Sequence, residues 1–391
     1  MSKNILFVVP TLSGGGAERV VSELSQFLDE KGYNVVIAAF NEDSPGYDYG
    51  GELVNMEVPR SDSIFSKIKS VLYRVKELKR IKSTYDIDKS ISFLVSPNIA
   101  NILSIQGEQT IISVRNNLSR KMLESGNRQR EIMSKHLFNK ADKVVCISKG
   151  VKEDVVSNFG VDESKAEVAY NPCDVSKIQE KAEEGLGRFE DIFDKPVLIN
   201  VGRLTKQKGQ DRLIEIFAEV KKRKKDTRLV ILGEGEKKQQ LIDIAESYGL
   251  NVYTGGELSQ KFDVFFLGFQ DNPFKFMASA DLFVFTSRWE GLGNVVLESM
   301  ACGTLVISSD CEYGPREIIA PNINIGSDLE HPTVSYNGVL VPENEGIGRW
   351  ADTICSFLED RKDKRDNIEN YAKKYISKYE ENVLNLWREI I

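Results

Sequence analysis

The sequence is poor in the residues that hold metals or build disulfide frameworks. Its 391 residues include only five cysteines and two histidines. The cysteines are scattered and odd in number, and no CxxC pair occurs, so the pattern favours neither a disulfide framework nor a zinc site. We therefore expect no metal cofactor and a reducing, cytoplasmic environment.

Long hydrophobic runs and an excess of positive charge are also missing. No stretch approaches the ~18 consecutive apolar residues of a membrane-spanning helix. The first apolar run, NILFVVP, is too short for the core of a signal peptide. The net charge is −7, whereas nucleic-acid-binding domains are normally strongly basic. We expect no membrane span and no nucleic-acid partner.

What the sequence does contain is two successive series of alternating strand-like and helix-like segments. A chain of 391 residues exceeds one typical core, so two domains are the natural expectation. Such alternation is typical of doubly wound parallel sheets. The strand-like runs cover residues 4–10, 34–40, 89–95, 110–114 and 142–148 in the first series and 196–202, 228–233, 264–269, 281–287 and 304–309 in the second.

We therefore predict an α/β fold of two Rossmann-like domains, residues 1–172 and 173–369, followed by a helix over residues 370–391. In open parallel sheets ligands bind beyond the carboxyl ends of the strands. Two such domains facing one another would form a deep cleft there. The strand ends are therefore the places to search for chemistry.

The stretch SRWEGLGNVVLESMACGTLVIS, residues 287–308, follows one strand-like run and carries two carboxylates eight residues apart. Gly291 and Gly293 suit a sharp turn, and Asn294 suits the N-cap of a helix through VVLESMAC. The unpaired N–H groups and the dipole at such a helix start favour an anion, and phosphate is the usual one.

The two carboxylates, Glu290 and Glu298, would then flank a phosphate site. Carboxylates repel phosphates, so they are better suited to accept hydrogen bonds from hydroxyls, one on a ribose and one on a second sugar. An ordinary strand–helix unit with a solvated glutamate has the same spacing. The spacing alone leaves both interpretations open.

Two other strand ends of the second domain carry cations and glycines. VGRLTKQKGQD places Arg203 and Lys208 five residues apart in a loop, where they could neutralise a diphosphate, Arg as a bidentate fork and Lys as a point charge. GEGE contains Gly233, which could line a base or a sugar. A solvated basic loop and a plain turn are the alternatives. Together with the glycine turn and the carboxylates, these features describe a site for a nucleoside diphosphate that bears a sugar.

In the first domain, the first strand ends in PTLSGGGAERV. Gly15 and Gly16 let a backbone approach a ligand closely, but Arg19 stands where the dinucleotide fingerprint needs Gly or Ala. The loop therefore argues against a dinucleotide oxidoreductase. A plain tight turn remains an alternative.

Taken in order, VGRLTKQKG, LGEGE, FLGF and the Glu290 to Glu298 stretch resemble the C-terminal domain of the retaining family 4 glycosyltransferases, which have the GT-B fold. The resemblance covers nearly the whole chain and implies a final helix that packs back onto the first domain. The site that it implies has Arg203 and Lys208 at the donor diphosphate, Glu290 at the donor sugar, Glu298 at the ribose, Gly291, Leu292, Gly293 and Asn294 at the phosphates or sugar, Phe266 and Leu267 at the base, and Gly15, Gly16 and Gly233 beside the donor.

The activity that this resemblance implies is metal-independent, retaining transfer of a hexose from a nucleoside diphosphate sugar to a glycan hydroxyl. UDP is the expected nucleotide. Arg203, Lys208 and the helix dipole would stabilise the leaving diphosphate, and family members are thought to react on the front face of the sugar. A double displacement would need Glu290 close to the anomeric carbon, and the residues do not exclude that role.

One departure from the family concerns the segment TIISVRNN. Many relatives have a histidine near the sugar in such a segment, whereas this chain has Arg115, followed by Asn116. Arginine could bind a phosphate or a sugar hydroxyl but cannot act as a base near neutral pH. We place Arg19, Arg115 and Asn116 on the acceptor side, and a purely structural arginine is the alternative.

The acceptor is suggested by residues 61–82, SDSIFSKIKSVLYRVKELKRIK, which carry seven basic residues and apolar residues at helical spacing. Such a helix can rest on an anionic membrane surface, which suits a polyprenyl-diphosphate-linked acceptor on the cytoplasmic face. The alternative is a helix packed on its own sheet with a solvated basic face. The segment SSDCEYGPREII, residues 308–319, resembles relatives that build lipid-linked or capsular polysaccharides.

Two other functional classes stay open. One is a GT-B-like sugar-nucleotide epimerase, which would release no nucleoside diphosphate. The other is a noncatalytic subunit of a glycan synthase complex, which would bind the nucleotide sugar without turnover. The expected site residues are all present, which argues against a decayed site but does not prove turnover. They are Arg203, Lys208, Glu290 and Glu298.

Overall fold

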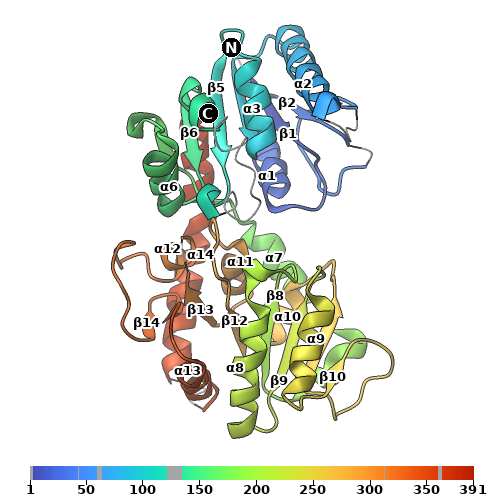
Figure 1. Ribbon diagram of the computed structural model, residues 1–391, viewed down its shortest axis with the longest axis vertical. Coiled ribbons are helices and arrows are strands. Elements are labelled where there is room, and N and C mark those ends of the chain that lie inside the picture. Colours follow the sequence, from blue (N-terminus) through green and yellow to red (C-terminus); the bar gives the residue numbers. More distant parts are fainter. Residues whose placement is uncertain (1–2, 43, 60–63, 121–133, 312, 360–362) are drawn as a thin grey trace. The chain divides into compact units, whose positions relative to one another are not determined.

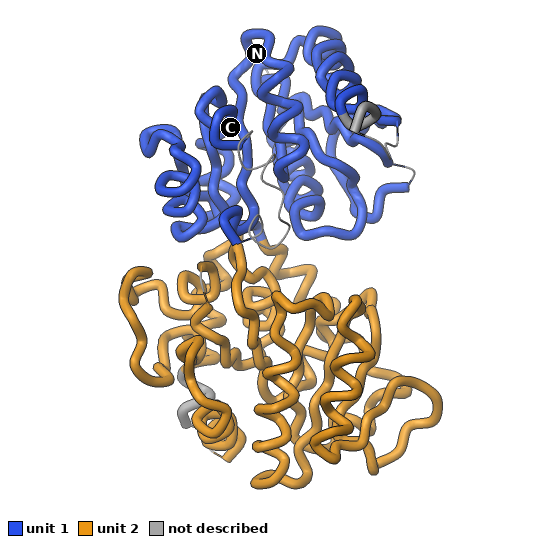
Figure 2. The backbone as a smooth tube through the Cα atoms, in the orientation of Figure 1, with its two compact units in different colours: residues 1–172, 381–391 blue, residues 173–380 orange. Residues whose placement is uncertain are grey.

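The computed structural model describes residues 3–42, 44–59, 64–120, 134–311, 313–359 and 363–391. The chain divides into two compact units, coloured separately in Figure 2. Unit 1 comprises residues 1–172 and 381–391, and unit 2 comprises residues 173–380. Both are α/β, with helices packed against a central sheet (Figure 1).

The sheet of unit 1 has seven parallel strands in the order β3-β2-β1-β4-β5-β6-β7. Its central strands are continuous apolar runs and are buried, as expected for a parallel sheet covered on both faces. Strands and helices are β1 (Asn4–Val9), α1 (Gly16–Glu30), β2 (Asn34–Ala39), β3 (Glu52–Asn55), α2 (Ile64–Thr84), β4 (Lys89–Phe93), α3 (Val95–Leu103), β5 (Gln109–Val114), β6 (Lys143–Cys146), α6 (Lys149–Phe159) and β7 (Ala166–Val168).

The sheet of unit 2 has eight strands in the order β10-β11-β9-β8-β12-β13-β15-β14. At one edge of this otherwise parallel sheet, β14 pairs antiparallel with β15 through a short hairpin. Its elements are α7 (Val175–Ala182), β8 (Val197–Val201), α8 (Gln210–Arg223), β9 (Arg228–Leu232), α9 (Lys238–Ser247), β10 (Val252–Tyr253), β11 (Val264–Gly268), α10 (Phe274–Ser279), β12 (Leu282–Phe285), α11 (Asn294–Ala301), β13 (Val306–Asp310), α12 (Pro315–Ile319), β14 (Thr333–Ser335), β15 (Gly338–Pro342), α13 (Ile347–Glu359) and α14 (Asp363–Ile390).

In each sheet the chain passes from one half of the sheet to the other at a central point. It lies between β1 and β4 in unit 1 and between β8 and β12 in unit 2. Loops that leave the carboxyl ends of strands on either side of such a point diverge and leave a crevice where ligands bind. The fold therefore directs attention to the loops after β8 and β12.

The C-terminal helix α14 contributes to both units, and the predicted start of its unit 1 portion at residue 370 is wrong. Ile368 packs in the hydrophobic core of unit 2, and Glu380 accepts a hydrogen bond from the Val175 backbone N–H at 3.2 Å. Only the last part of the helix, from residue 381 on, belongs to unit 1. There the Trp387 indole donates to the Tyr170 carbonyl at 2.9 Å. The side chains along the helix therefore change partners near Glu380.

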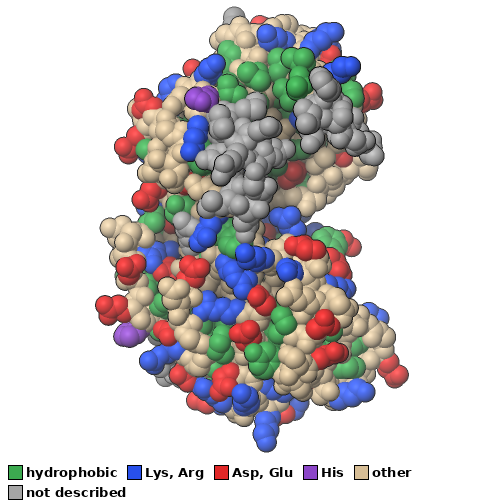
Figure 3. All heavy atoms as spheres, viewed as in Figure 1, with side chains coloured by type: hydrophobic (Ala, Val, Ile, Leu, Met, Phe, Trp, Pro, Cys, Tyr) green, Lys and Arg blue, Asp and Glu red, His purple; other side chains and the backbone are tan. Residues whose placement is uncertain are grey.

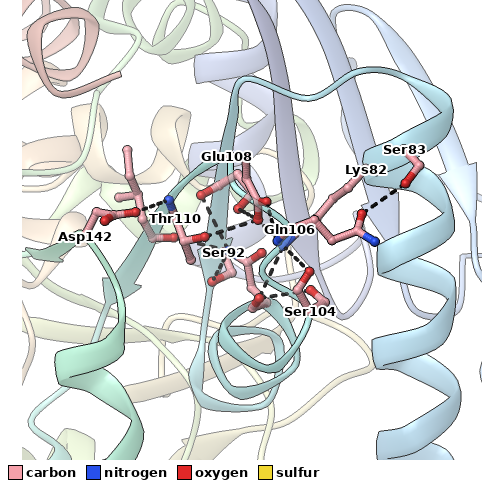
Figure 4. Close-up of polar contacts among 11 residues, drawn as sticks. Lys82, Ser83, Ser92, Ser104, Gln106, Glu108, Thr110 and Asp142 are labelled. Carbon is pink, nitrogen blue, oxygen red and sulfur yellow. Dashed lines mark hydrogen bonds and ion pairs between the residues drawn. The ribbon is translucent and has the colours of Figure 1, made fainter.

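A buried ion pair fixes the end of α2 to unit 1 (Figure 4). The side chains of Lys82 and Glu108 are each 2% exposed and form a close ion pair. Lys82 Nζ also donates to the carbonyls of Asn101 and Ser104, at 3.2 and 3.3 Å. Glu108 accepts from the hydroxyls of Ser90 and Thr110 and from the Gln106 N–H, each within 3.2 Å. Both charges are therefore well provided with hydrogen bonds.

Candidate functional site

The loop after β8 carries Arg203 and Lys208 and packs closely on the loop after β9. Leu204 N donates to the Glu234 carbonyl at 2.9 Å, and Gly233 N donates to the Gly268 carbonyl at 2.8 Å. Gly233 has φ +133°, and a Cβ there would lie 2.1 Å from the Gly202 carbonyl oxygen. Only glycine allows this approach. Gly233 therefore shapes the loop that presents the cations.

Within this loop, Arg203 is exposed, and its guanidinium has no hydrogen bond or ion pair with any residue that the structure describes. Its carbonyl accepts from the Gln210 side chain at 3.1 Å, which fixes the backbone. An exposed guanidinium on a fixed backbone can bind an anion bidentately. The structure thus leaves Arg203 available to a ligand.

The second cation, Lys208, is paired with Glu290 from the loop after β12. Lys208 Nζ lies 2.7 Å from Glu290 Oε1, and the two side chains are 18% and 7% exposed. The ammonium also lies 5.4 Å from the centre of the Phe285 ring. No other hydrogen bond to the Glu290 carboxylate is recorded within the described part of the chain. This pair therefore keeps donors and an acceptor available to a ligand.

Glu290 is followed by the predicted glycine turn and helix. Gly293 has φ +89° and is itself the N-cap of α11, so the prediction that Asn294 is the N-cap is wrong, and Asn294 is the first helical residue. A Cβ at Gly314, in the loop before α12, would lie 2.5 Å from the backbone of Leu292. Leu292 is itself buried, so the turn is fixed by packing on both its side chain and its backbone. The N-terminal N–H groups of α11 are those that a helix leaves without intrahelical partners.

Further along α11, Glu298 is half-buried in the second turn. In the view of Figure 3, Lys and Arg side chains gather in the upper part of unit 2 among a few acidic ones. The loops after β8 and β12 thus combine exposed cations, a paired carboxylate and a helix N-terminus. Such a set can bind a diphosphate and hydroxyl groups together.

The carboxyl-terminal part of β11 differs from the expectation for the base site. Phe266 is 2% exposed and belongs to the hydrophobic core of unit 2, so its side chain is not available to a ligand. Leu267 is half-buried, and its carbonyl accepts from the Gln270 side chain at 2.7 Å. Phe269 is 73% exposed. Val264, Phe265 and Phe266 are all buried, because this strand is covered on both faces of the sheet, which the motif alone did not reveal.

In unit 1, the glycine loop after β1 leads into α1. Gly15 is the N-cap of α1 and Gly16 its first residue. A Cβ at Gly15 would lie 2.1 Å from the Glu18 carboxylate. Arg19 Nε lies 2.9 Å from Glu23 Oε1 on the next turn, so its guanidinium forms an ion pair along its own helix.

Arg115, after β5, is buried with only 7% exposed. It donates to the Ser113 hydroxyl at 3.2 Å, and its guanidinium lies 5.5 Å and 5.9 Å from the ring centres of Phe93 and Trp387. Asn116 and Arg115 also line a small pocket with Asn98. The aromatic contacts give Arg115 a structural role in unit 1, next to a polar pocket at the carboxyl edge of the sheet.

A strained residue borders the same pocket. Leu94 has φ +75° and ψ +158°, a conformation that is almost restricted to glycine. Sequence reasoning did not single out Leu94 or Asn98. A single sequence carries no signal of backbone strain at a leucine, and Asn98 is one of many asparagines.

Sequence reasoning also missed the side chains that join the two loops of unit 2, chiefly Arg288, which pairs with Asp211 at 2.6 Å. Its position two residues before Glu290 was the one available signal. Elsewhere, no group of three or more His, Cys, Asp or Glu side chains among the described residues could hold a metal ion. None of the helices in the described ranges is both long and apolar enough to cross a membrane.

Comparison with known proteins gives matches over both units. Residues 14–177 match the model of Glycosyltransferase Family 4, and residues 188–375 match that of Glycosyl transferases group 1. The chain is 32% identical over 294 residues to an uncharacterized glycosyltransferase of Methanocaldococcus jannaschii, covering 74% of this chain and 70% of that protein.

A second relative is the N-acetylgalactosamine-N,N'-diacetylbacillosaminyl-diphospho-undecaprenol 4-alpha-N-acetylgalactosaminyltransferase of Campylobacter jejuni. It is 32% identical over 326 residues, covering 81% of this chain and 83% of that protein. Among solved structures, HepE of Anabaena in complex with UDP has a TM-score of 0.75 at 18% identity, covering 100% of this chain and 99% of that one. The fold is that of the GT-B enzymes, and the chain belongs to the family 4 glycosyltransferases.

Proposed function

We propose that this glycosyltransferase moves a hexose from a UDP-sugar to a hydroxyl of a glycan acceptor with retention of configuration at the anomeric carbon. The observation that carries the proposal is the Lys208–Glu290 pair between the loops after β8 and β12, where the chain of unit 2 passes from one half of its sheet to the other. HepE, a structural neighbour, was solved with UDP bound, which supports UDP as the nucleotide.

In this proposal the leaving diphosphate is stabilised by unit 2. Arg203 forms a bidentate contact, Lys208 adds a point charge, and the N-terminus of α11 adds its dipole and N–H groups. Charge on the diphosphate grows as the bond to the sugar breaks, so these groups act most strongly in the transition state. Glu298 holds ribose hydroxyls, and no metal is needed to neutralise the diphosphate.

Glu290 is proposed to accept hydrogen bonds from the donor sugar. Its Oε1 is paired with Lys208, which lowers the nucleophilicity of that oxygen and favours reaction on the front face over a covalent glycosyl-enzyme. The stereochemistry is tested by determining the anomeric configuration of the new glycosidic bond by NMR and comparing it with that of the donor. A product of inverted configuration would overturn the retaining assignment.

The acceptor is proposed to be a glycan linked to a polyprenyl diphosphate at the cytoplasmic face of a membrane. The Campylobacter relative is named for such a diphospho-undecaprenol substrate. On α2, Ile68 and Leu72 are 56% and 63% exposed, and Lys69, Lys76 and Lys79 are exposed around them. Figure 3 shows hydrophobic and basic side chains together in the upper part of unit 1, where α2 lies. Apolar side chains among lysines suit an anionic lipid surface.

This membrane contact has its own test. In flotation with vesicles that contain anionic lipid, the wild type should bind, and the Ile68→Ser/Leu72→Ser variant should bind several-fold less. Vesicles of neutral lipid alone should bind neither protein well. Equal flotation of wild type and variant would remove α2 from the account.

On the acceptor side, unit 1 is proposed to present Arg115 and Asn116 at the pocket beside Leu94. The Gly15–Gly16 loop would approach the donor, and Arg19 would orient that loop through its pairing with Glu23. Arg115 cannot serve as a base near neutral pH. Its proposed part is to bind an acceptor oxygen.

The reaction is tested with purified protein and UDP-, GDP- and ADP-sugars. Release of nucleoside diphosphate is measured with and without a lipid extract that contains polyprenyl-linked glycans. Release from a UDP-sugar that depends on the extract supports the proposal. Binding of the UDP-sugar without release of UDP under every condition would favour a noncatalytic subunit. Conversion of the UDP-sugar into its epimer without release of UDP would favour an epimerase.

A further inference from the structure

One residue, Arg288, joins the loop that carries Lys208 to the loop that carries Glu290. Its backbone N–H donates to the Gln207 carbonyl at 2.8 Å, and its Nη1 donates to the Lys206 carbonyl at 2.7 Å. Its Nη2 lies 2.6 Å from Asp211 Oδ2, in the first turn of α8. Arg288 thus holds the residues on both sides of Lys208.

Two further hydrogen bonds, one donated from each loop, complete the connection. The Gln207 side chain donates to the Trp289 carbonyl at 2.9 Å, and the Thr286 hydroxyl donates to the Gly209 carbonyl at 3.0 Å. Gly209 has φ +64°, and a Cβ there would lie 2.2 Å from the Thr286 carbonyl oxygen. The two loops are therefore interlocked at each residue around Lys208.

The connection depends on the shape of the guanidinium. One planar fork serves a carbonyl and a carboxylate at once, and a lysine ammonium could not hold both positions in the same plane. Burial alone would raise the pKa of Asp211, but the hydrogen bond and charge of Arg288 bring it below its ordinary value. The carboxylate therefore stays ionised and keeps Arg288 in place.

Partial exposure separates this connection from an ordinary packing contact. The Arg288 and Asp211 side chains are 31% and 39% exposed, so the pair adds little to the stability of the fold. Its effect is on geometry. An error of about 1 Å in the position of a reacting or binding group can cost about 10²-fold in rate.

We propose that Arg288, oriented by Asp211, is a positioning residue that sets Lys208 against Glu290 in the geometry that the donor requires. This inference rests on the proposed function, since it assigns Lys208 and Glu290 to the diphosphate and the sugar. In this inference, Arg288 itself contacts neither the diphosphate nor the sugar.

The test compares Arg288→Lys, Arg288→Gln and Asp211→Asn with a matched control, Arg223→Gln, at the other end of α8. Arg223 forms partly exposed ion pairs with Glu219 and Asp352, far along the chain from the loops. For each variant, kcat and KM for the donor, UDP affinity by calorimetry and Tm are measured.

We expect kcat to fall about 10- to 100-fold in both Arg288 variants and less in Asp211→Asn. UDP affinity should fall several-fold, while Tm changes no more than in Arg223→Gln. The Arg288→Gln/Asp211→Asn double variant should be no worse than Arg288→Gln alone, because both changes break one connection.

Wild-type kcat and UDP affinity in the Arg288 and Asp211 variants would overturn the inference, as would losses that simply follow Tm. If an Arg288 variant does not fold, Asp211→Asn decides alone, since its substitution keeps the size of the side chain. A wild-type protein that neither binds UDP nor releases it would instead reject the donor site itself, and the two failures are therefore distinguishable.

Discussion

Two of the Lys–Glu ion pairs, one in each unit, differ in burial, in the number of their other partners and in their place on the sheet. Lys82–Glu108 in unit 1 is 2% exposed on both sides and is surrounded by five further hydrogen-bonding partners. Lys208–Glu290 in unit 2 is 18% and 7% exposed. The first pair lies near the amino ends of its strands, and the second at the carboxyl ends.

The difference separates an ion pair that holds the fold from one that is ready for a ligand. A buried charge whose every partner is a protein group has no capacity for substrate, and its bonds fix α2 and α3 to the sheet. A pair that has few other partners, at an edge where ligands bind, can exchange a bond with a diphosphate or a sugar hydroxyl. Residue type alone would not distinguish them.

The largest effect is expected at the unit 2 pair. Glu290→Gln and Lys208→Gln should each reduce kcat for nucleoside diphosphate release about 10²- to 10³-fold, because each removes a group that we propose to stabilise developing charge or to hold the sugar. Lys208→Gln should also lower the stability of the fold, because it leaves the nearly buried Glu290 carboxylate without its cation, whereas Glu290→Gln leaves no unpaired carboxylate. Steady-state kinetics and thermal unfolding check this. Normal turnover in either variant would place the site elsewhere.

Removing one partner of the unit 1 pair should instead lower the stability of the fold. Lys82→Met leaves Glu108 buried without its cation and should lower the free energy of unfolding by about 3–5 kcal/mol. The Lys82→Met/Glu108→Leu double variant should recover much of that loss, since two apolar groups need no partner. Urea denaturation measures both variants. Full stability of the single variant would contradict the structural role.

The smallest effect is expected in the dependence of folding stability on acidic pH. Burial alone would raise the pKa of Glu108, but the Lys82 hydrogen bond and charge and the Gln106 N–H bring it below its ordinary value of 4.5. A carboxyl whose pKa is lowered by folding stabilises the fold above its unfolded pKa and loses that contribution as pH falls through the folded value. Between about pH 5 and pH 3 the wild type should therefore lose stability more steeply than Lys82→Met/Glu108→Leu. Parallel curves would show that Glu108 is not the group responsible.

Much of this fold could be predicted from the sequence because its central strands are continuous apolar runs separated by amphipathic helices. The strands that followed from that pattern are β1, β2, β4, β5 and β6 in unit 1 and β8, β9, β11, β12 and β13 in unit 2. The short edge strands β3, β10 and β14 carry no such run, and nothing local showed that β14 is antiparallel. Likewise, the change of partners near Glu380 depends on contacts between residues far apart in sequence.

Part of the candidate site could also be named from the sequence, and the roles of its residues stay predictions. Arg203, Lys208 and Glu290 could be named because charged residues after apolar strands stand out. The burial of Phe266, the N-cap at Gly293 and the Arg288–Asp211 connection could not, because each depends on backbone geometry or on a partner in another loop.

The most direct test of the account measures UDP release from a UDP-sugar, with lipid extract as acceptor, for three proteins side by side. They are the wild type, Glu290→Gln, and Lys82→Met/Glu108→Leu assayed at a temperature where it is folded. The account predicts acceptor-dependent release by the wild type and by the unit 1 double variant, and its loss in Glu290→Gln. Release that survives in Glu290→Gln, or that disappears only when the unit 1 pair is changed, would contradict it.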